Sequence, residues 1–179
     1  MKKLIDILNK GGVAVVPTDT IYGLSAVYNN LAAKKRIVDL KSRDHKKAFI
    51  ILVSSIKDLD LLGVVLTKEE ELFLKKYWPG KVSVVLTRDV GGTIACRLPG
   101  NKFLQGIIKK TGPLYSTSAN ITGQESASDI SQAKSYFADK VNIYVDKGPL
   151  ISGPSTLVRY FKGKWQLLRA GDVVIDEIR

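Results

Sequence analysis

The sequence is poor in the residues that bind metals or form cross-links. Its 179 residues include a single cysteine and a single histidine. A disulfide framework, a zinc finger, an HExxH protease site and a Cys/His zinc cage each need at least two such residues, so the composition excludes all four. His45 lies in a basic stretch, and nothing in the sequence identifies a carboxylate that would orient it as a general base. We therefore predict that the protein itself ligates no metal.

Long hydrophobic runs and the common nucleotide-binding motifs are also missing. No stretch of roughly 18 apolar residues occurs, and the N-terminus reaches the acidic Asp6 too soon for a signal peptide. Neither GxxxxGK[ST] nor GxGxxG is present, so any phosphate binding uses neither a P-loop nor a Rossmann turn. A GxSxG elbow is absent as well. We expect a cytoplasmic protein without a membrane partner.

Positive charge is in clear excess. The chain has 28 Lys and Arg against 17 Asp and Glu, a net charge of +11. This excess indicates either a polyanionic partner or an anionic substrate, and it does not choose between them. With 45% hydrophobic residues the chain is long enough for one core and short for two. Because no linker or break in composition occurs, we expect one domain over residues 1–179.

Hydrophobic periodicity predicts alternating helices and strands. Thr67 and Glu70 form a capping-box pattern at the start of one helix, and in the helix over 31–41 we expect Leu31 inward and Lys34 outward. Apolar strands indicate a sheet covered on both faces, with antiparallel pairing near the C-terminus. We therefore predict an α/β fold with a twisted mixed sheet flanked by helices. The expected strands are 13–16, 49–53, 82–86, 93–98, 142–145, 156–160 and 165–168, and the expected helices are 4–10, 31–41, 67–78, 103–110 and 129–138.

Small polar residues gather in clusters at or after strands, where α/β proteins place ligands. Each cluster also has a plain structural explanation, as a capped turn or a solvated face. Hydroxyl and amide groups beside Arg and Lys suit an anion or a nucleotide. Arg97 interrupts an apolar strand, and the pattern leaves open whether it faces solvent or an anion. The clusters lie at 17–24, 41–47, 93–99, 115–123 and 148–156, the last with 169–171.

In this order and at these spacings the clusters resemble the threonylcarbamoyl-AMP synthase family, also called the YrdC/Sua5 family. The length is similar to that of the short bacterial form. Some positions depart from the family pattern: Asp44 and Ala48 replace prolines, and Leu52 stands where some members have a histidine. The matching segments are PTDTIYGL at 17–24, KSR at 41–43, WPG at 78–80, RLP at 97–99, STSANITG at 116–123, GPSTLV at 153–158 and LRAG at 168–171.

The resemblance implies a YrdC-like fold and a nucleotidyltransferase. Such an enzyme joins L-threonine, bicarbonate or CO2 and ATP into threonylcarbamoyl-AMP and releases pyrophosphate. Mg2+ accompanies the ATP, and a downstream transferase complex uses the product to modify adenosine 37 of tRNA. Weak contact with tRNA fits the same picture. Because α-phosphoryl transfer depends mainly on positioning and charge stabilisation, such an enzyme needs no catalytic His or Cys.

The resemblance also implies roles for individual residues. Arg97 would hold the carboxylate of threonine, and Lys41 with Arg43 would neutralise phosphate charge during catalysis. The full threonine site would consist of Thr20, Arg97, Ser118 and Ser155. The ATP site would consist of Arg43, Lys47, Thr93, Asn120, Ser128 and Arg169.

Two alternatives remain at this point. The first is a non-catalytic RNA-binding or ribosome maturation factor, whose binding would weaken steeply with salt. Net charge favours it, but charge does not explain the hydroxyl-rich motifs, and no RNP-like or KH-type motif is present. The second is a family paralogue with another carbamoyl acceptor, in which the ATP motifs would persist and the threonine motifs would not.

Overall fold

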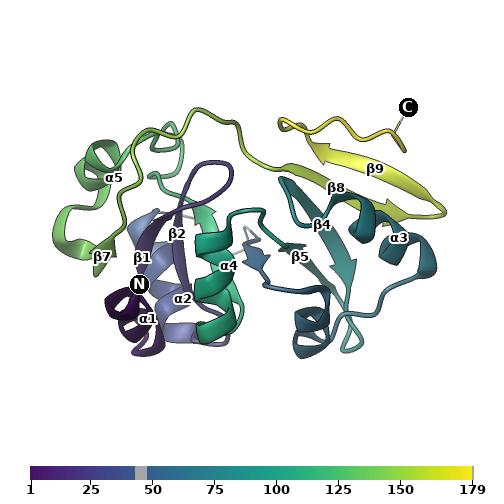
Figure 1. The fold of residues 1–179 in the computed structure, drawn as a ribbon, viewed down its shortest axis with the longest axis horizontal. Coiled ribbons are helices and arrows are strands. Elements are labelled where there is room, and N and C mark those ends of the chain that lie inside the picture. Colours follow the sequence, from purple (N-terminus) through teal and green to yellow (C-terminus); the bar gives the residue numbers. More distant parts are fainter. Residues whose placement is uncertain (43–47, 179) are drawn as a thin grey trace.

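One continuous nine-stranded sheet runs through the protein (Figure 1). The structure is a computed structural model that describes residues 1–42 and 48–178. The strands lie in the order β7-β1-β2-β6-β3-β5-β4-β8-β9. They are β1 (Ala14–Pro17), β2 (Tyr22–Val27), β3 (Ile50–Leu52), β4 (Val82–Thr87), β5 (Thr93–Arg97), β6 (Leu114–Ser118), β7 (Ile143–Tyr144), β8 (Thr156–Phe161) and β9 (Lys164–Arg169).

The sheet is mixed, as the sequence predicts. β1 pairs with β7, β3 with β5 and β4 with β8 in parallel. The remaining pairs are antiparallel, including the C-terminal β8–β9 hairpin. β6 lies between β2 and β3 and therefore joins segments that are far apart in the sequence. The predicted α/β class with a mixed sheet is confirmed.

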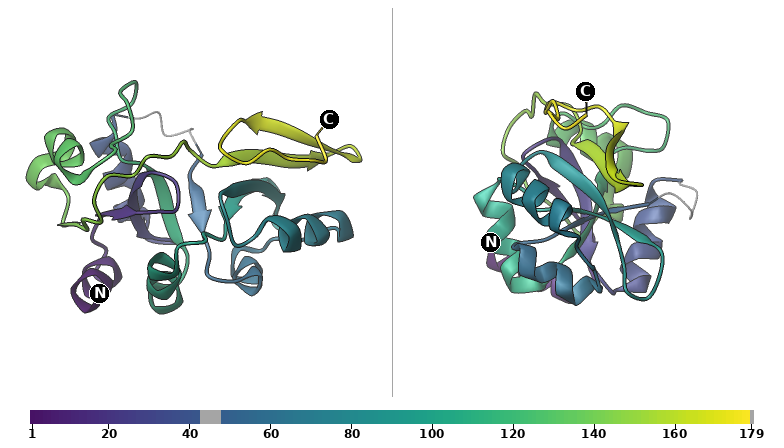
Figure 2. Two further views of the ribbon diagram at one scale, coloured as in Figure 1. Left: turned by 45° about the horizontal axis from the view of Figure 1, so that its top comes forward. Right: turned by 90° about the vertical axis from the view of Figure 1, so that its right-hand side faces the viewer.

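Helices cover both faces of the sheet (Figure 2). On one face α1 and α4 bury Leu4, Leu8 and Leu104 against β1, β3 and β6. On the other face α2, α3 and α5 contribute to a larger core that includes Ile37 and Phe73. Each helix that the structure describes is too short or too polar to cross a bilayer. The helices are α1 (Lys2–Asn9), α2 (Leu31–Leu40), η1 (Ile56–Leu62), α3 (Lys68–Tyr77), α4 (Lys102–Thr111), α5 (Ile130–Phe137) and η2 (Ala138–Lys140).

The predicted inner face of α2 is wrong at its first turn. Leu31 is 73% exposed, whereas Ala33, Ile37 and Val38 are buried. Lys34, expected to face solvent, is half-buried. At 3.6 residues per turn Lys34 shares a face with Val38, four residues further on, so helical geometry places the lysine beside the core.

Two strands and the short helix η1 were not predicted. β2 contains Gly23 and Ser25, and β6 consists largely of hydroxyl residues, so neither resembles a typical strand. Their tertiary position explains them, because β2 pairs with β1 and β6, and β6 in turn pairs with β3. The hydroxyl-rich residues near 116–118 thus belong to a central strand rather than to a loop.

The C-terminal residues return to the sheet beside α3 (Figure 1). The rings of Phe73 and Trp165 stack with centroids 3.7 Å apart, which joins α3 to β9. Tyr77 donates a hydrogen bond of 2.7 Å to Glu177, and Ile175 is buried in the larger core. The β8–β9 hairpin is therefore held in place by helix and tail together.

The capping box of α3 gives a test of local stability. Thr67 accepts a hydrogen bond from the Glu70 amide at 3.2 Å, and the Glu70 carboxylate accepts one from the Thr67 amide at 2.9 Å. We expect Thr67→Ala to lower the free energy of unfolding by about 1 kcal/mol, because helix N–H groups lose their acceptor. Urea denaturation measures this change. The exposed Lys75→Ala on the same helix is the control, and equal effects of the two variants would contradict a capping role.

Candidate functional site

A cavity of about 790 Å³ opens where several distant segments meet in the sheet. Its lining includes residues of the β1–β2 loop, of β3, β5 and β6, of the segment that leads into β8, and of the end of β9. The described lining residues include the cations Lys34, Arg97 and Arg169 and no carboxylate. The cavity is therefore suited to an anionic ligand.

Arg97, at the end of β5, carries the most strongly buried charge in this cavity. Its side chain is only 5% exposed, which settles the question that the sequence left open: the guanidinium points inward. Nη1 donates to the Thr20 hydroxyl at 3.0 Å, and Nη2 lies 3.2 Å from the Asp19 carboxylate. Nε has no hydrogen-bond partner among the described residues. An unpaired buried N–H is costly, so the described residues satisfy the hydrogen-bonding capacity of Arg97 only in part.

The electrostatics of Arg97 favour an anion as well. Burial lowers the pKa of Arg97, Asp19 opposes that shift, and the neighbouring charge of Arg169 adds to it. The Asp19 carboxylate is also tied to the backbone, because it accepts a 2.8 Å hydrogen bond from the Gly100 amide. Asp19 therefore joins the β1–β2 loop to the segment after β5 and compensates only one of two nearby guanidinium charges.

Arg169 and Ser155 form the opposite part of the site. The guanidinium donates to the Ser155 carbonyl from Nε at 3.1 Å and from Nη2 at 2.8 Å, and Nη2 also donates to the Ser155 hydroxyl at 3.0 Å. The Ser83 hydroxyl, fully buried on β4, lies 2.7 Å from that of Ser155. A Cβ at Gly171 would overlap the carbonyl oxygen of Pro154, so this contact requires glycine.

Lys41 holds the loop after β6, which begins at the cavity-lining Ser118. Its buried ammonium donates to the Ser118 carbonyl at 2.5 Å and to the carbonyl and side-chain oxygens of Asn120 at 2.8 and 2.7 Å. The Ser118 hydroxyl in turn donates to the Asn120 side chain at 2.6 Å. In this structure the ammonium of Lys41 therefore binds loop oxygens, and its role toward phosphate stays a prediction.

The other predicted residues are placed as follows. The cavity lining includes Thr20, Thr93, Arg97, Ser118, Ser155 and Arg169. Asn120 is not part of the described lining but contacts it through Ser118. Ser128 is exposed and its amide donates to the Gln132 side chain. Arg43 and Lys47 lie outside the described residues. The structure thus brings most of the predicted threonine and ATP residues together, and their roles remain predictions.

Three further residues contribute to the site without having been predicted to do so. Lys34 lines the cavity with its ammonium 5.7 Å from the centre of the Tyr115 ring. Its spacing of seven residues from Lys41 puts both on one face of the chain and could have revealed it. Thr18 and Ser83 contact Thr20 and Ser155 through their hydroxyls. Thr18 belongs to the segment 17–24 and Ser83 follows the WPG segment at 78–80, but sequence spacing does not show hydroxyl contacts.

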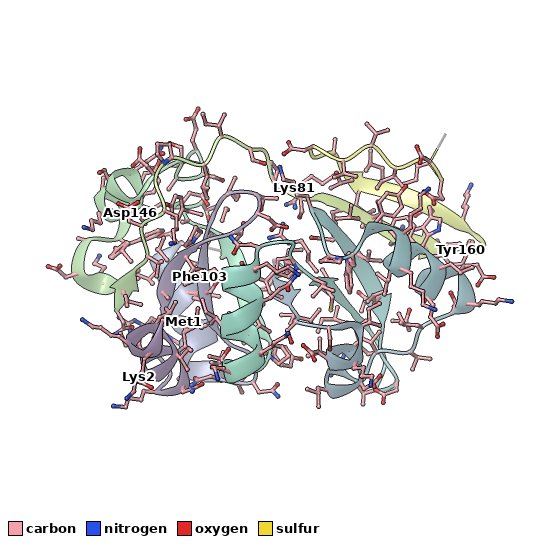
Figure 3. All side chains as sticks on the ribbon, viewed as in Figure 1. Met1, Lys2, Lys81, Phe103, Asp146 and Tyr160 are labelled. Carbon is pink, nitrogen blue, oxygen red and sulfur yellow. The ribbon has the colours of Figure 1, made fainter. Side chains whose placement is uncertain are left out.

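Outside this cavity, the remaining charged and nucleophilic groups are placed as follows. Within residues 1–42 and 48–178, no group of three or more His, Cys, Asp or Glu side chains could hold a metal ion. Lys81 lies where the segment before β8 passes the start of β4 (Figure 3). Its ammonium donates to Asp172 and to Ser152, both at 2.9 Å. Cys96 is buried, and burial raises the pKa of its thiol to about 12, so it is not a ready nucleophile.

Fold and cavity together define an α/β protein with a mixed sheet and a cationic, hydroxyl-lined ligand site. The Sua5/YciO/YrdC family model, described as telomere recombination, matches residues 6–171. The chain therefore belongs to the Sua5/YciO/YrdC family, which confirms the resemblance that its motifs suggest.

Individual relatives agree with this assignment. The threonylcarbamoyl-AMP synthase of Pseudoalteromonas translucida is 30% identical over 176 residues, covering 89% of this chain and 92% of the relative. That of Thiobacillus denitrificans is 30% identical over 173 residues, covering 91% of each. P. abyssi Sua5 complexed with L-threonine matches with a TM-score of 0.89 at 28% identity. That match covers 95% of this chain, which spans 53% of the P. abyssi chain.

The tight packing at Gly171 gives a test of how the site is built. We expect Gly171→Ala to lower the free energy of unfolding by about 2 kcal/mol, because the added methyl overlaps the backbone at Pro154 and Thr156. Gly106→Ala, within α4 and with only the Met1 methyl as near as 4.0 Å, is expected to stabilise by about 0.5 kcal/mol. Urea denaturation compares the two variants. A neutral Gly171→Ala would mean that the loop at 153–156 moves aside freely.

The Lys41 contacts give a second test. We expect Lys41→Met to destabilise the protein by about 2 kcal/mol, because three oxygens of the 118–120 loop lose a charged donor. Hydrogen exchange of the backbone amides at 118–124 should become faster. Lys35→Met on the exposed side of α2 removes only a surface ion pair and is the control. Unchanged amide exchange in Lys41→Met would contradict a role in holding this loop.

Proposed function

We propose that this protein is a threonylcarbamoyl-AMP synthase, a nucleotidyltransferase that uses L-threonine, bicarbonate or CO2, and ATP. The observation that carries the proposal is the buried guanidinium of Arg97, which lines the cavity, donates from Nη1 to the Thr20 hydroxyl and has no partner for Nε among the described residues. Such a group suits the carboxylate of an amino acid. Relatives that bear this enzyme's name, and a related structure complexed with L-threonine, support the same substrate.

The reaction needs charge compensation more than a protein nucleophile. The threonine amine adds to CO2 with loss of a proton, or to bicarbonate with loss of water, to give a carbamate. The carbamate oxygen then attacks the α-phosphorus of ATP while pyrophosphate leaves. An anion thus approaches a polyanion, and each unit charge neutralised at about 4 Å is worth roughly 4 kcal/mol at an effective dielectric constant of about 20. Lys34, Arg97 and Arg169 supply such charges at the cavity. Positioned donors of this kind stabilise phosphoryl transfer.

The proposed roles divide the residues of the site into an amino-acid site and an ATP site. Arg97 holds the threonine carboxylate, with Thr20, Ser118 and Ser155 completing the amino-acid site. Arg169 and Thr93 face the ATP, and Mg2+ arrives with ATP as part of that substrate. Asn120 and Ser128, together with Arg43 and Lys47, complete the proposed ATP site. Lys41 and Arg43 are the proposed neutralising pair for phosphate charge.

The product needs an acceptor enzyme. A mixed anhydride of a carbamate and a phosphate is labile in water, so we infer direct consumption by a threonylcarbamoyl transferase acting on tRNA. This places the protein in the cytoplasm, where ATP and tRNA occur together. Positive charge outside the cavity, as at Lys109 and Lys110, is compatible with a weak tRNA contact.

The reaction itself provides the test. Purified protein is expected to release pyrophosphate from ATP only when threonine and bicarbonate are both present, and mass spectrometry should detect threonylcarbamoyl-AMP. Arg97→Met should lower turnover by about 100-fold, because the substrate carboxylate loses its charged donor. Arg36→Met, at a half-buried arginine that is not among the described lining residues of the cavity, serves as the control. Pyrophosphate release that continues unchanged without threonine would refute the proposal.

A further inference from the structure

Two hydroxyl groups in the cavity, those of Thr20 and Ser155, each contact an arginine and a second hydroxyl group. Thr20 accepts from Arg97 at 3.0 Å and lies 2.8 Å from the Thr18 hydroxyl. Ser155 accepts from Arg169 at 3.0 Å and lies 2.7 Å from the Ser83 hydroxyl. Each hydroxyl has one proton and two lone pairs. The remaining partners therefore determine what each hydroxyl can still offer to a ligand.

At Thr18 the direction of the hydrogen bonds is fixed. Its hydroxyl lies 2.7 Å from the carbonyl oxygen of Ile21, which can only accept, so the Thr18 proton is used there. The hydroxyl oxygen of Thr18 also accepts a hydrogen bond of 3.0 Å from the Thr20 amide. The hydroxyl of Thr20 must then donate to Thr18. Thr20 therefore turns one free lone pair, and no proton, toward the cavity.

At Ser155 the same reasoning gives the opposite result. The Ser83 side chain is fully buried, and the Ser155 hydroxyl is its one hydrogen-bond partner among the described residues. A buried O–H without an acceptor costs about 1–3 kcal/mol, so Ser83 donates to Ser155. Ser155 then accepts from both Ser83 and Arg169. Its own proton remains for the cavity.

We propose that Thr18 and Ser83 are positioning residues that give the site a fixed hydrogen-bond polarity, in which Thr20 accepts from the substrate and Ser155 donates to it. The inference rests on the proposed function for the identity of the substrate, an amino acid. The free lone pair of Thr20 then accepts a hydrogen bond from that amino acid, either from its ammonium or from its side-chain hydroxyl. Ser155 selects an anionic or carbonyl oxygen. A site of this kind discriminates because mismatched buried polar groups remain unpaired.

Replacement of Thr18 tests the polarity directly. Thr18→Val keeps the shape but removes the acceptor for the Thr20 proton, which then points at the substrate donor. We expect L-threonine to bind at least about tenfold more weakly, as measured by titration calorimetry without ATP. Thr18→Ser keeps every hydroxyl contact and should bind within about threefold of the unmodified chain. Equal weakening in both variants, or none in Thr18→Val, would overturn the proposal.

O-methyl-L-threonine distinguishes the two possible donors. It keeps the side-chain oxygen but has no hydroxyl proton. If the threonine hydroxyl is the donor, Thr18→Val should reduce the preference for threonine over the methyl ether. If the ammonium is the donor, both ligands should weaken in parallel. Either result supports an accepting Thr20, whereas tighter binding of threonine by Thr18→Val would refute it.

A neutron diffraction structure of the unmodified protein provides a measurement that needs no variant. We expect the hydroxyl deuterium of Thr20 to lie between Thr20 and Thr18, and the hydroxyl deuterium of Ser83 to lie between Ser83 and Ser155. A Thr20 deuterium directed into the cavity would overturn the proposal. If the unmodified chain fails to bind L-threonine, the proposed function is refuted instead, and the neutron map still decides the hydroxyl orientations.

Discussion

The site depends on the contacts that the buried guanidinium of Arg97 makes. A charge this deep in a protein is costly unless its donors are satisfied, and here Asp19 and Thr20 satisfy only part of them. Because Asp19 also holds the Gly100 amide, the same contacts fix the β1–β2 loop against the segment after β5. The contacts of Arg97 with Asp19 and Thr20 shape the loop, and the neighbouring Arg169 leaves the cavity with a second positive charge that Asp19 does not pair with.

The sheet order makes this arrangement possible. β5 lies between β3 and β4, and β8 follows on the other side of β4, so Arg97 and Ser155 line the same cavity although they are 58 positions apart in the sequence. The second arginine, Arg169, returns on β9 and bonds the backbone of Ser155. Two guanidinium groups thus share one cavity, each joined to a hydroxyl. Repulsion between them is relieved when an anion binds.

Local features were the most predictable from the sequence. The capping box at Thr67 and the apolar strands depend on neighbours within a few residues, so pattern alone identified them. β2 and β6 were not predicted, because their Gly, Ser and Thr residues acquire strand structure from pairing on both sides. Lys34 was misplaced because charge suggested solvent, while the helical period placed it beside Val38.

For the site, the sequence by itself determined which chemical groups are available: hydroxyls, amides and arginines in ordered motifs, with almost no cysteine or histidine. Those motifs were enough to indicate the family. Only the tertiary structure decided that Arg97 points inward, that the ammonium of Lys41 binds loop oxygens, and that Thr18 and Ser83 contact the hydroxyls of Thr20 and Ser155. The physical reason is that hydrogen-bond direction and burial depend on partners brought together by strand pairing, and residue order does not encode those distances locally.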